Sequence, residues 1–364
     1  MTVRYGVIGA GMMAREHIRN LALMPECAVS ALADPDPAML QEAQADCNGT
    51  PRIFSDHQSL LDAGICDALL VATPNHTHAA ILTDILPHEL PILMEKPLAT
   101  TAADCRRILE AARERIAPVW VAMEYRYMPP ITMLCEKVHA GLIGRVITVT
   151  VREYRYPFLD KVGNWNRFNR NTGGTLVEKC CHYWDLMRFV VASDPVRIYA
   201  SGAMDINHIH ERYDGQAPDI IDNAFAIADF ANGTRGMMDL CMFGEGYHWQ
   251  EEISVTGSEA RIDARIPGPP RFDPNGRAHQ ARIELSRRDG KTVPLTLPDL
   301  DDSLLRVGDH HGATYFQMQR FHQLVKTGRG QPDVTLEDGL WSVVIGEAAE
   351  ASVQSGQSVE IDLS

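Results

Sequence analysis

The sequence predicts an α/β domain built on a doubly wound parallel sheet, followed by an α+β domain built on a largely antiparallel open sheet. Up to residue 122, short apolar runs alternate with amphipathic segments, as in parallel sheets with helices on both faces. Beyond that point long alternating strands come first and two helices come last, which is typical of α+β domains. A length of 364 residues suits two domains, which we place at 1–122 and 123–364.

A glycine-rich turn lies between the first predicted strand, residues 3–8, and the first predicted helix. Gly9 permits a tight turn, Gly11 leaves the backbone open to a pyrophosphate, and Ala14 lets the helix pack closely on the strand. The N–H groups at the start of the helix favour phosphate. We therefore predict a dinucleotide site at this turn, formed by Gly9, Ala10, Gly11, Met12 and Met13.

An acidic residue ends the second predicted strand. Asp34 follows residues 28–33, roughly 20 residues after the glycine turn, where a carboxylate holds the ribose hydroxyls. The same carboxylate repels the 2′-phosphate of NADP, so we expect NAD rather than NADP. A chance glycine pair beside a turn-forming Asp is the alternative, but it leaves the ordered strand, turn, helix, strand and acid unexplained.

Composition limits the classes of partner and the location. With 45% hydrophobic and 23% charged residues the chain is typical of globular proteins, and no apolar run reaches the length of a membrane span. The formal net charge of −14 argues against nucleic acid or an anionic membrane surface as partner. The first strand leaves no room for a signal peptide. Eight cysteines without a CxxC pair indicate reduced thiols, and a disulfide between the adjacent Cys180 and Cys181 would be strained. We expect a cytoplasmic protein.

Two polar segments follow buried strands at the edge where open α/β sheets bind ligands. In the segment over residues 72–78, Thr73 and Asn75 could reach a cofactor, while helix capping by Asn75 or Thr77 is an equal alternative. Its two histidines have no third ligand nearby, so no metal site is predicted. In the second segment, Lys96 could donate a proton or a hydrogen bond to a reacting oxygen, although a solvated lysine is the default for so short a motif.

A third segment opens a helix predicted over residues 173–191. Glu178 and His182 are four residues apart and would share a helix face, with Asp185 one turn beyond. A carboxylate beside an imidazole suits general acid–base catalysis. A histidine paired with a helix neighbour as ordinary surface chemistry is an equal alternative.

Aromatic, Arg and Asn side chains are dense over residues 152–158 and 165–170, and such groups suit a sugar ring. An edge strand followed by a structural loop is the alternative. Residues 309–311 precede a late helix and are interpreted first as a cap, with a substrate contact or a metal fragment as alternatives.

Taken in order, these motifs resemble the Gfo/Idh/MocA family, the group of glucose–fructose oxidoreductase, inositol dehydrogenases and rhizopine catabolism proteins. The resemblance covers the whole chain. It rests on the glycine turn, residues 72–78, Glu95-Lys96-Pro97, residues 125–129, residues 141–144 and the Gly-Gly-x3-Glu-x3-His-x2-Asp pattern. It implies a nicotinamide-dependent oxidoreductase of sugars, polyols or their derivatives, with Lys96 and His182 as catalytic groups and a cis peptide before Pro97. This chain has Glu178 where the family usually has Asp, and Cys180 where it often has Gly.

We therefore expect hydride transfer between NAD and a secondary hydroxyl. In this hypothesis His182 takes the hydroxyl proton, Glu178 and Asp185 orient or tune it, and Lys96 polarises the substrate oxygen. Two alternatives are an NAD-dependent glycosidase of the same fold and a non-enzymatic sensor of NAD and a sugar, although retention of Lys96 and His182 argues against the sensor. The resemblance also implies a homodimer or homotetramer formed through an exposed sheet face of the second domain.

Two sets of contacts complete the prediction. The expected cofactor contacts are Gly9, Ala10, Gly11, Met12, Met13, Asp34, Thr73, Pro74, Asn75, His78, Glu95, Lys96 and Arg126. The expected substrate contacts are Lys96, Glu124, Tyr154, Arg155, Trp165, Asn166, His182 and His311.

Overall fold

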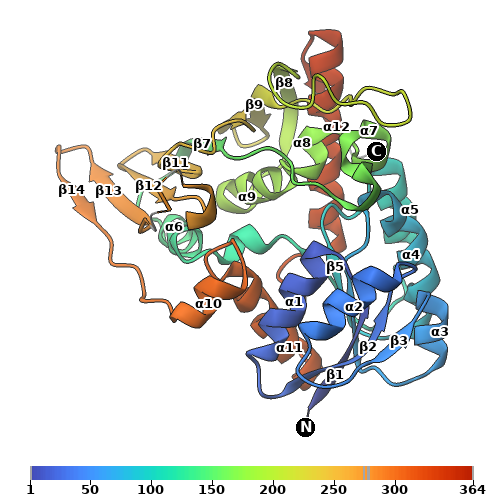
Figure 1. Ribbon diagram of the computed structural model, residues 1–364. Helices are drawn as coiled ribbons and strands as arrows, with labels where there is room; N and C mark the ends of the chain where they lie inside the picture. Colours follow the sequence, from blue (N-terminus) through green and yellow to red (C-terminus); the bar gives the residue numbers. More distant parts are fainter. Residues whose placement is uncertain (1, 274, 277–278, 363–364) are drawn as a thin grey trace. The chain divides into compact units, whose positions relative to one another are not determined.

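The first apolar run forms a central strand of a parallel sheet (Figure 1). In the computed structural model, which describes residues 2–273, 275–276 and 279–362, β1 lies between β2 and β4. The sheet order is β3-β2-β1-β4-β5-β6, so the strand order reverses between β1 and β4, as the doubly wound prediction requires. Its strands are β1 (Val3–Ile8), β2 (Cys27–Ala33), β3 (Arg52–Phe54), β4 (Ala68–Val71), β5 (Ile92–Glu95) and β6 (Val119–Ala122).

The helices of this region follow the strands in alternation. Every residue of β4, β5 and β6 is buried, as strands covered on both faces require. Asp36 and Thr101 cap α2 and α5 with side-chain hydrogen bonds to backbone N–H groups. The helices are α1 (Met12–Ala22), α2 (Pro37–Ala45), α3 (His57–Asp62), α4 (His78–Ile85) and α5 (Ala102–Ala111).

Residue contacts divide the chain into two compact units. Unit 1 runs to Glu124 and also contains Leu300–Val343, whereas unit 2 contains Tyr125–Asp299 and the chain from Val344 onward. This division differs from 1–122 and 123–364 because α10 (Asp302–Val307) and α11 (Ala313–Thr327) pack on α1. Phe321 of α11 is buried, with its ring centroid 6.4 Å from that of Tyr5 and 6.1 Å from that of Trp120. Residues 300–343 thus complete the core of the first unit.

Unit 2 is built on a nine-stranded sheet of order β14-β13-β12-β11-β7-β10-β9-β8-β15. All neighbouring strands are antiparallel except β7 and β10, so the largely antiparallel sheet is confirmed. The predicted hairpin turn holds Gly233 at φ +84°, a conformation that favours glycine. The strands are β7 (Val146–Tyr154), β8 (Pro195–Ala203), β9 (Asn223–Phe230), β10 (Arg235–Cys241), β11 (Glu251–Gly257), β12 (Ala260–Ile266), β13 (Arg282–Arg287), β14 (Thr292–Pro294) and β15 (Val359–Glu360).

One face of this sheet is covered by helices. Alternate residues of β7 and β9 are buried. Helix α6 packs against β12, and helix α9 packs against β7. The helices of unit 2 are α6 (Pro129–His139), α7 (Asn169–Thr172), α8 (Thr175–Glu178) and α9 (Cys181–Val191); α12 (Leu336–Ser355) is divided between the units at Val343. Within the described residues, no helix combines the length and apolarity needed to cross a membrane.

The single helix predicted over residues 173–191 is wrong, because the chain is interrupted at residues 179–180 between α8 and α9. In a continuous helix the Leu176 carbonyl would accept from the N–H of Cys180. Here it accepts from the Trp184 indole N–H at 2.8 Å, and the Cys180 N–H turns to the Thr175 carbonyl at 3.4 Å. The Trp184 indole thus occupies the carbonyl that would otherwise continue the helix, and Glu178 and His182 lie on different helices.

Candidate functional site

The glycine turn has the form that a dinucleotide requires. Gly9 has φ +90°, and a Cβ built there would lie 2.5 Å from the Ala72 carbonyl oxygen, so only glycine fits. Gly11 is the N-cap of α1, and a Cβ there would meet nothing within 4 Å. No side chain caps α1, and its first turn, which begins at Met12, carries no acidic residue. This end of the helix suits a phosphate.

Asp34 lies directly beside this turn. Its Oδ2 accepts from the N–H of Ala10 at 2.8 Å, and its Oδ1 accepts from the N–H of Asp36 at 2.8 Å. These two bonds fix the carboxylate at the end of β2, next to the point where the strand order reverses. The position agrees with recognition of the ribose hydroxyls.

His78 joins the turns that follow β4 and β5. Its ring is fully buried, with Nδ1 2.7 Å from the Pro97 carbonyl oxygen and Nε2 2.9 Å from that of Thr73. Burial lowers the pKa of this imidazole. His78 therefore holds the Lys96-Pro97 turn against the preceding loop, and the peptide before Pro97 is cis, as expected.

The segment over residues 74–77 does not cap its helix through side chains. Thr77 stands at the N-cap of α4 without a capping bond, and its hydroxyl donates to the Pro74 carbonyl at 2.7 Å. Asn75 is buried in a short 3-10 turn that also lacks a side-chain cap. Thr77 therefore takes the N-cap position that the capping alternative expected, without the capping hydrogen bond, whereas Asn75 is not an N-cap. The role of Asn75 toward a cofactor stays a prediction.

A buried ion pair supports the strand end that carries Lys96. His17 Nε2 donates to Glu95 Oε1 at 2.6 Å, and both residues are buried. Burial alone would lower the pKa of His17, but the hydrogen bond and charge of Glu95 outweigh it and raise that pKa. Burial likewise opposes ionisation of Glu95, yet His17 brings its pKa below the usual value. Both shifts favour the ionised forms of the pair.

A second acid–imidazole group lies nearby in unit 1. Glu16 accepts from the Thr314 hydroxyl at 2.8 Å and lies 3.3 Å from His310 Nδ1. Although burial opposes it, His310 and Thr314 lower the pKa of Glu16 to about 2. His310 Nε2 is also 4.0 Å from Glu124, whose pKa is raised by burial and by Glu95.

Glu16, His17 and His310 are not among the site residues predicted from the sequence. The interpretation of residues 309–311 as a cap is wrong, because Gly312, at φ +79°, is the N-cap of α11 and no side chain caps that helix. His311 lies before this cap at φ +51°. The missed signal is the pair Glu16-His17, which lies one turn into the helix that follows the glycine turn.

In unit 2, the imidazole of His182 lies flat on an aromatic ring. The ring centroids of His182 and Tyr125 are 4.2 Å apart and their planes differ by 8°. Both side chains are buried, as is Glu178 at the end of α8. Asp185 forms a bidentate pair with Arg126, with Nε–Oδ2 at 2.7 Å and Nη2–Oδ1 at 2.5 Å. The structure thus gives Asp185 a firm partner in Arg126, and the expected roles of both residues stay predictions.

The four predicted substrate residues of the aromatic segment have different surroundings. The Tyr154 hydroxyl donates to Asp239 at 3.1 Å, whereas Arg155, with a side chain 12% exposed, lies 3.6 Å from Glu153. Asn166 is fully buried and donates to the Leu159 carbonyl at 3.0 Å, which is a loop-stabilising contact. Trp165 is half-buried, and its carbonyl accepts from Asn171.

A buried group of charges lies behind His182. Glu153 and Glu251 are paired residues of β7 and β11, and both are almost fully buried. The Lys179 ammonium lies 2.8 Å from Glu153. Burial first, and then the neighbouring Glu153, raise the pKa of Glu251 to about 7. Two carboxylates this close do not both ionise readily, so Glu251 keeps its proton in the acidic range.

The fold and the glycine turn define an NAD-binding oxidoreductase of the α/β class. The chain belongs to the Gfo/Idh/MocA oxidoreductase family: the family's NAD-binding Rossmann fold domain matches residues 3–123, and its C-terminal alpha/beta domain matches residues 135–361. The myo-inositol 2-dehydrogenase of Thermotoga maritima is 25% identical over 364 residues and 99% of each chain. The inositol 2-dehydrogenase of Pseudomonas fluorescens is 27% identical, over 100% of this chain and 98% of the relative.

Solved structures agree on the fold. Levoglucosan dehydrogenase in complex with NADH superposes with a TM-score of 0.83 at 21% identity, and each chain is covered completely. An oxidoreductase from Agrobacterium radiobacter, solved with NAD+, L-tartaric acid and magnesium, gives a TM-score of 0.79 at 19% identity over 99% of this chain and 98% of that one.

The position of Asp34 leads to a first prediction. Steady-state kinetics should give a kcat/KM for NAD at least roughly tenfold above that for NADP, since hydrogen bonds to a charged group contribute about 1.5–3 kcal/mol. Asp34→Ala should reduce that ratio. Asp36→Ala, which removes the cap of α2, is the matched control and should leave the ratio unchanged. Equal use of both cofactors by the wild-type protein would contradict this role for Asp34.

The carboxylate pair leads to a second prediction. Unfolded Glu251 loses its proton near pH 4.3, whereas the folded protein holds it to about pH 7. The folded state therefore loses stability as the pH rises between these values. Glu251→Gln removes this loss. The difference in free energy of unfolding, variant minus wild type, should therefore be more positive at pH 8 than at pH 5, by an amount on the order of 1 kcal/mol. Urea unfolding of the variant and the wild type at both pH values measures this difference. The same difference between variant and wild type at pH 5 and pH 8 would refute the prediction.

Proposed function

We propose that this protein is an NAD-dependent dehydrogenase that transfers hydride between the nicotinamide and a secondary hydroxyl of a sugar, a polyol or a sugar derivative. The observation that carries this proposal is the placement of Lys96. It follows β5 at the carboxyl edge of the parallel sheet, where open α/β sheets bind ligands. Its turn is held by His78 and by the buried pair of Glu95 and His17. A lysine fixed in this way suits a reacting group better than a solvated charge.

The residues divide the chemistry between them. NAD, when bound at the glycine turn, supplies the hydride acceptor. Lys96 holds and polarises the substrate oxygen, and His182 removes the hydroxyl proton as general base. Glu178, buried at the end of α8 four residues before His182, orients or tunes the imidazole. Asp185 and Arg126 neutralise each other and fix the start of unit 2 to α9.

The relatives support the substrate class. Two relatives are named as dehydrogenases of inositol, which is a polyol. One structurally similar protein is levoglucosan dehydrogenase, solved with NADH and levoglucosan. We infer that a cyclic polyol or sugar is the substrate. A panel of inositols, anhydrosugars and hexoses with NAD, read as NADH absorbance, tests this. Release of a free sugar without net NADH would instead indicate the glycosidase, and binding without turnover would indicate the sensor.

The cysteines support a reducing location. None of the eight forms a disulfide among the described residues, including the adjacent Cys180 and Cys181, which are both fully buried. Burial raises the pKa of Cys180 well above its usual value, which keeps it in the thiol form. We propose a cytoplasmic protein on this basis.

The open face of the unit 2 sheet supports self-association. Tyr199, Phe225 and Ile227 lie on the adjacent strands β8 and β9 and are 45%, 59% and 52% exposed. Exposed apolar side chains gathered on neighbouring strands mark an interaction surface. We propose that a second copy of this chain covers the face and forms a homodimer or homotetramer.

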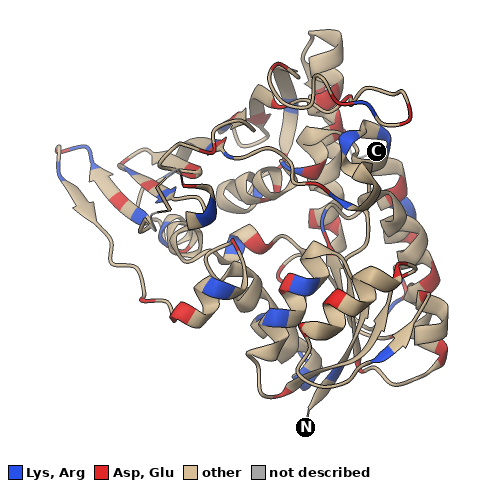
Figure 2. Ribbon diagram, in the orientation of Figure 1, with Lys and Arg blue, Asp and Glu red and all other residues tan. Residues whose placement is uncertain are grey.

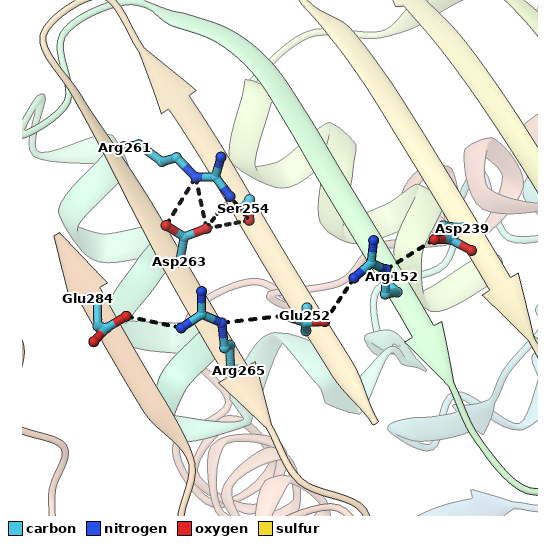
Figure 3. A network of polar contacts seen from close by, with 8 residues as sticks. All are labelled: Arg152, Asp239, Glu252, Ser254, Arg261, Asp263, Arg265 and Glu284. Atoms are coloured by element: carbon cyan, nitrogen blue, oxygen red, sulfur yellow. Dashed lines mark hydrogen bonds and ion pairs between the residues drawn. The ribbon is translucent and has the colours of Figure 1, made fainter. Parts of the chain in front are cut away.

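The charges on the same face suit an identical partner. Arg152 bridges Asp239 at 3.0 Å and Glu252 at 3.1 Å, and Arg265 bridges Glu252 at 3.3 Å and Glu284 at 3.0 Å (Figure 3). Basic and acidic residues are mixed along this end of the sheet (Figure 2). Because each charge already has a partner within the row, the surface needs no oppositely charged protein and can meet its own copy.

A single charge on the apolar patch tests the assembly. Phe225→Glu places a carboxylate in the contact and should convert the oligomer to monomers in sedimentation velocity, with the fold retained by circular dichroism. Ile116→Glu, at a side chain 93% exposed in unit 1, is the matched control and should not change the assembly. A monomeric wild type, or an unaltered Phe225→Glu oligomer, would rule out this interface.

Removal of the lysine charge tests the reaction assignment. Lys96→Met keeps the length of the side chain but cannot polarise an oxygen, so kcat should fall about 10²-fold or more while NAD binding is retained. Single-turnover and NAD titration experiments separate the two effects. Lys137→Met, on the exposed surface of α6, controls for loss of a positive charge. Activity near wild type would show that Lys96 is structural.

A double-mutant cycle tests whether Glu178 and His182 act as a unit. His182→Ala and Glu178→Gln should each lower kcat, and the double variant should be little worse than the worse single variant. Because α8 and α9 are separate helices, helical spacing no longer guarantees this coupling. If Glu178→Gln is silent while His182→Ala is not, Glu178 has no catalytic part.

A further inference from the structure

A lysine with a buried ammonium lies in the turn between α8 and α9. The side chain of Lys179 is only 4% exposed, and its Nζ is 2.8 Å from Glu153 Oε1. The same Nζ donates to the Tyr125 hydroxyl oxygen at 2.7 Å. An ammonium is costly to bury unless it is both paired and hydrogen-bonded, and these two contacts meet that requirement. No step of the proposed reaction uses Lys179.

Tyr125 links this lysine to His182. Its ring stacks on the imidazole at 4.2 Å and 8°, and the Tyr183 ring meets it edge-on at 5.5 Å and 73°. Tyr125 is thus held at its hydroxyl by Lys179, at one side by Tyr183 and on its face by His182. All four side chains belong to unit 2 and are buried.

We propose that Lys179 is a positioning residue for His182 and acts through Tyr125. The Lys179 bond sets the orientation of the phenol ring, and the phenol ring sets the plane of the imidazole that receives the substrate proton. Because a misplacement of about 1 Å can reduce a rate 10²-fold, a rigid support for the base has a direct effect on turnover. This inference rests on the proposed function, in which His182 is the base.

The carboxylates behind the lysine hold it in place. Glu153 pairs with Lys179 and also lies 3.6 Å from Arg155, while burial and Glu153 favour the neutral form of Glu251. Because Lys179 is buried and its ammonium lies 2.8 Å from Glu153 of β7, its orientation is defined by β7 rather than by solvent.

Two matched hydroxyl deletions give the kinetic test. Tyr125→Phe keeps the stacked ring but removes the acceptor of the Lys179 bond. We expect kcat to fall roughly tenfold or more with unchanged NAD affinity. Tyr183→Phe deletes the hydroxyl of the neighbouring buried ring, which has no hydrogen-bond partner among the described residues. This variant should behave as wild type. Equal kinetics for Tyr125→Phe, Tyr183→Phe and wild type would overturn the proposal.

The lysine itself is tested in a charge-balanced background. Lys179→Met alone leaves Glu153 buried without its cation, so Lys179→Met/Glu153→Gln removes both charges together. We expect this double variant to keep its thermal melting profile while kcat falls and the pH profile of kcat changes. Lys179→Arg retains a cation and should recover part of kcat relative to the double variant. A folded double variant with wild-type kcat and pH profile would overturn the proposal.

A spectroscopic readout separates this inference from the proposed function. The chain has 14 histidines, and in protein labelled with 13C-histidine the His182 signal is assigned by its loss in His182→Ala. The stacked phenol ring shifts the imidazole protons by its ring current, so Tyr125→Phe and the double variant should move or broaden that signal, whereas Tyr183→Phe should not. An unchanged signal overturns the positioning role. If the wild type reduces no NAD with any substrate of the panel, the proposed function fails, and the spectrum still decides whether Lys179 holds the ring pair.

Discussion

The buried ion pair of His17 and Glu95 is the interaction on which the first half of the site depends. A charge removed from water must find a partner inside the protein, and this 2.6 Å contact joins α1 to the end of β5. The helix that begins at the glycine turn is thereby fixed to the strand that presents Lys96. The positions of the dinucleotide turn and of the proposed catalytic lysine therefore depend on the same contact. Loss of His17 or Glu95 would leave the other residue buried without its partner.

The same requirement shapes the second unit with different residues. There the ammonium of Lys179 compensates Glu153, and the raised pKa of Glu251 favours its neutral form beside Glu153. This network lies next to the residues that contact His182. The groups that compensate one another's charge in the core therefore also determine the orientation of the proposed base. Stability and orientation are therefore coupled in both units.

Much of unit 1 could be predicted because its signals are local. The glycine turn and Asp34 are defined by a few neighbouring residues, and the apolar runs give the parallel strands. The cis peptide before Pro97 is expected from the family resemblance. The break at Lys179 could not be predicted, because it depends on the Trp184 indole taking the Leu176 carbonyl and on Glu350, 174 residues away, accepting from the Leu176 N–H at 2.8 Å. The assignment of α11 to unit 1 likewise depends on the distant contact of Phe321 with Tyr5.

The break between α8 and α9 also bears on Glu178, which stands where the family resemblance implies Asp. In one continuous helix, an acid four residues before the histidine would orient the imidazole directly, and its side-chain length would be critical. Here the imidazole lies on Tyr125, which is held by Lys179. If the ring plane is set in this way, the residue at 178 needs only to supply charge, and a longer Glu178 is compatible with an active site. The stacked ring would then take over the orienting task that helical spacing predicts for the carboxylate.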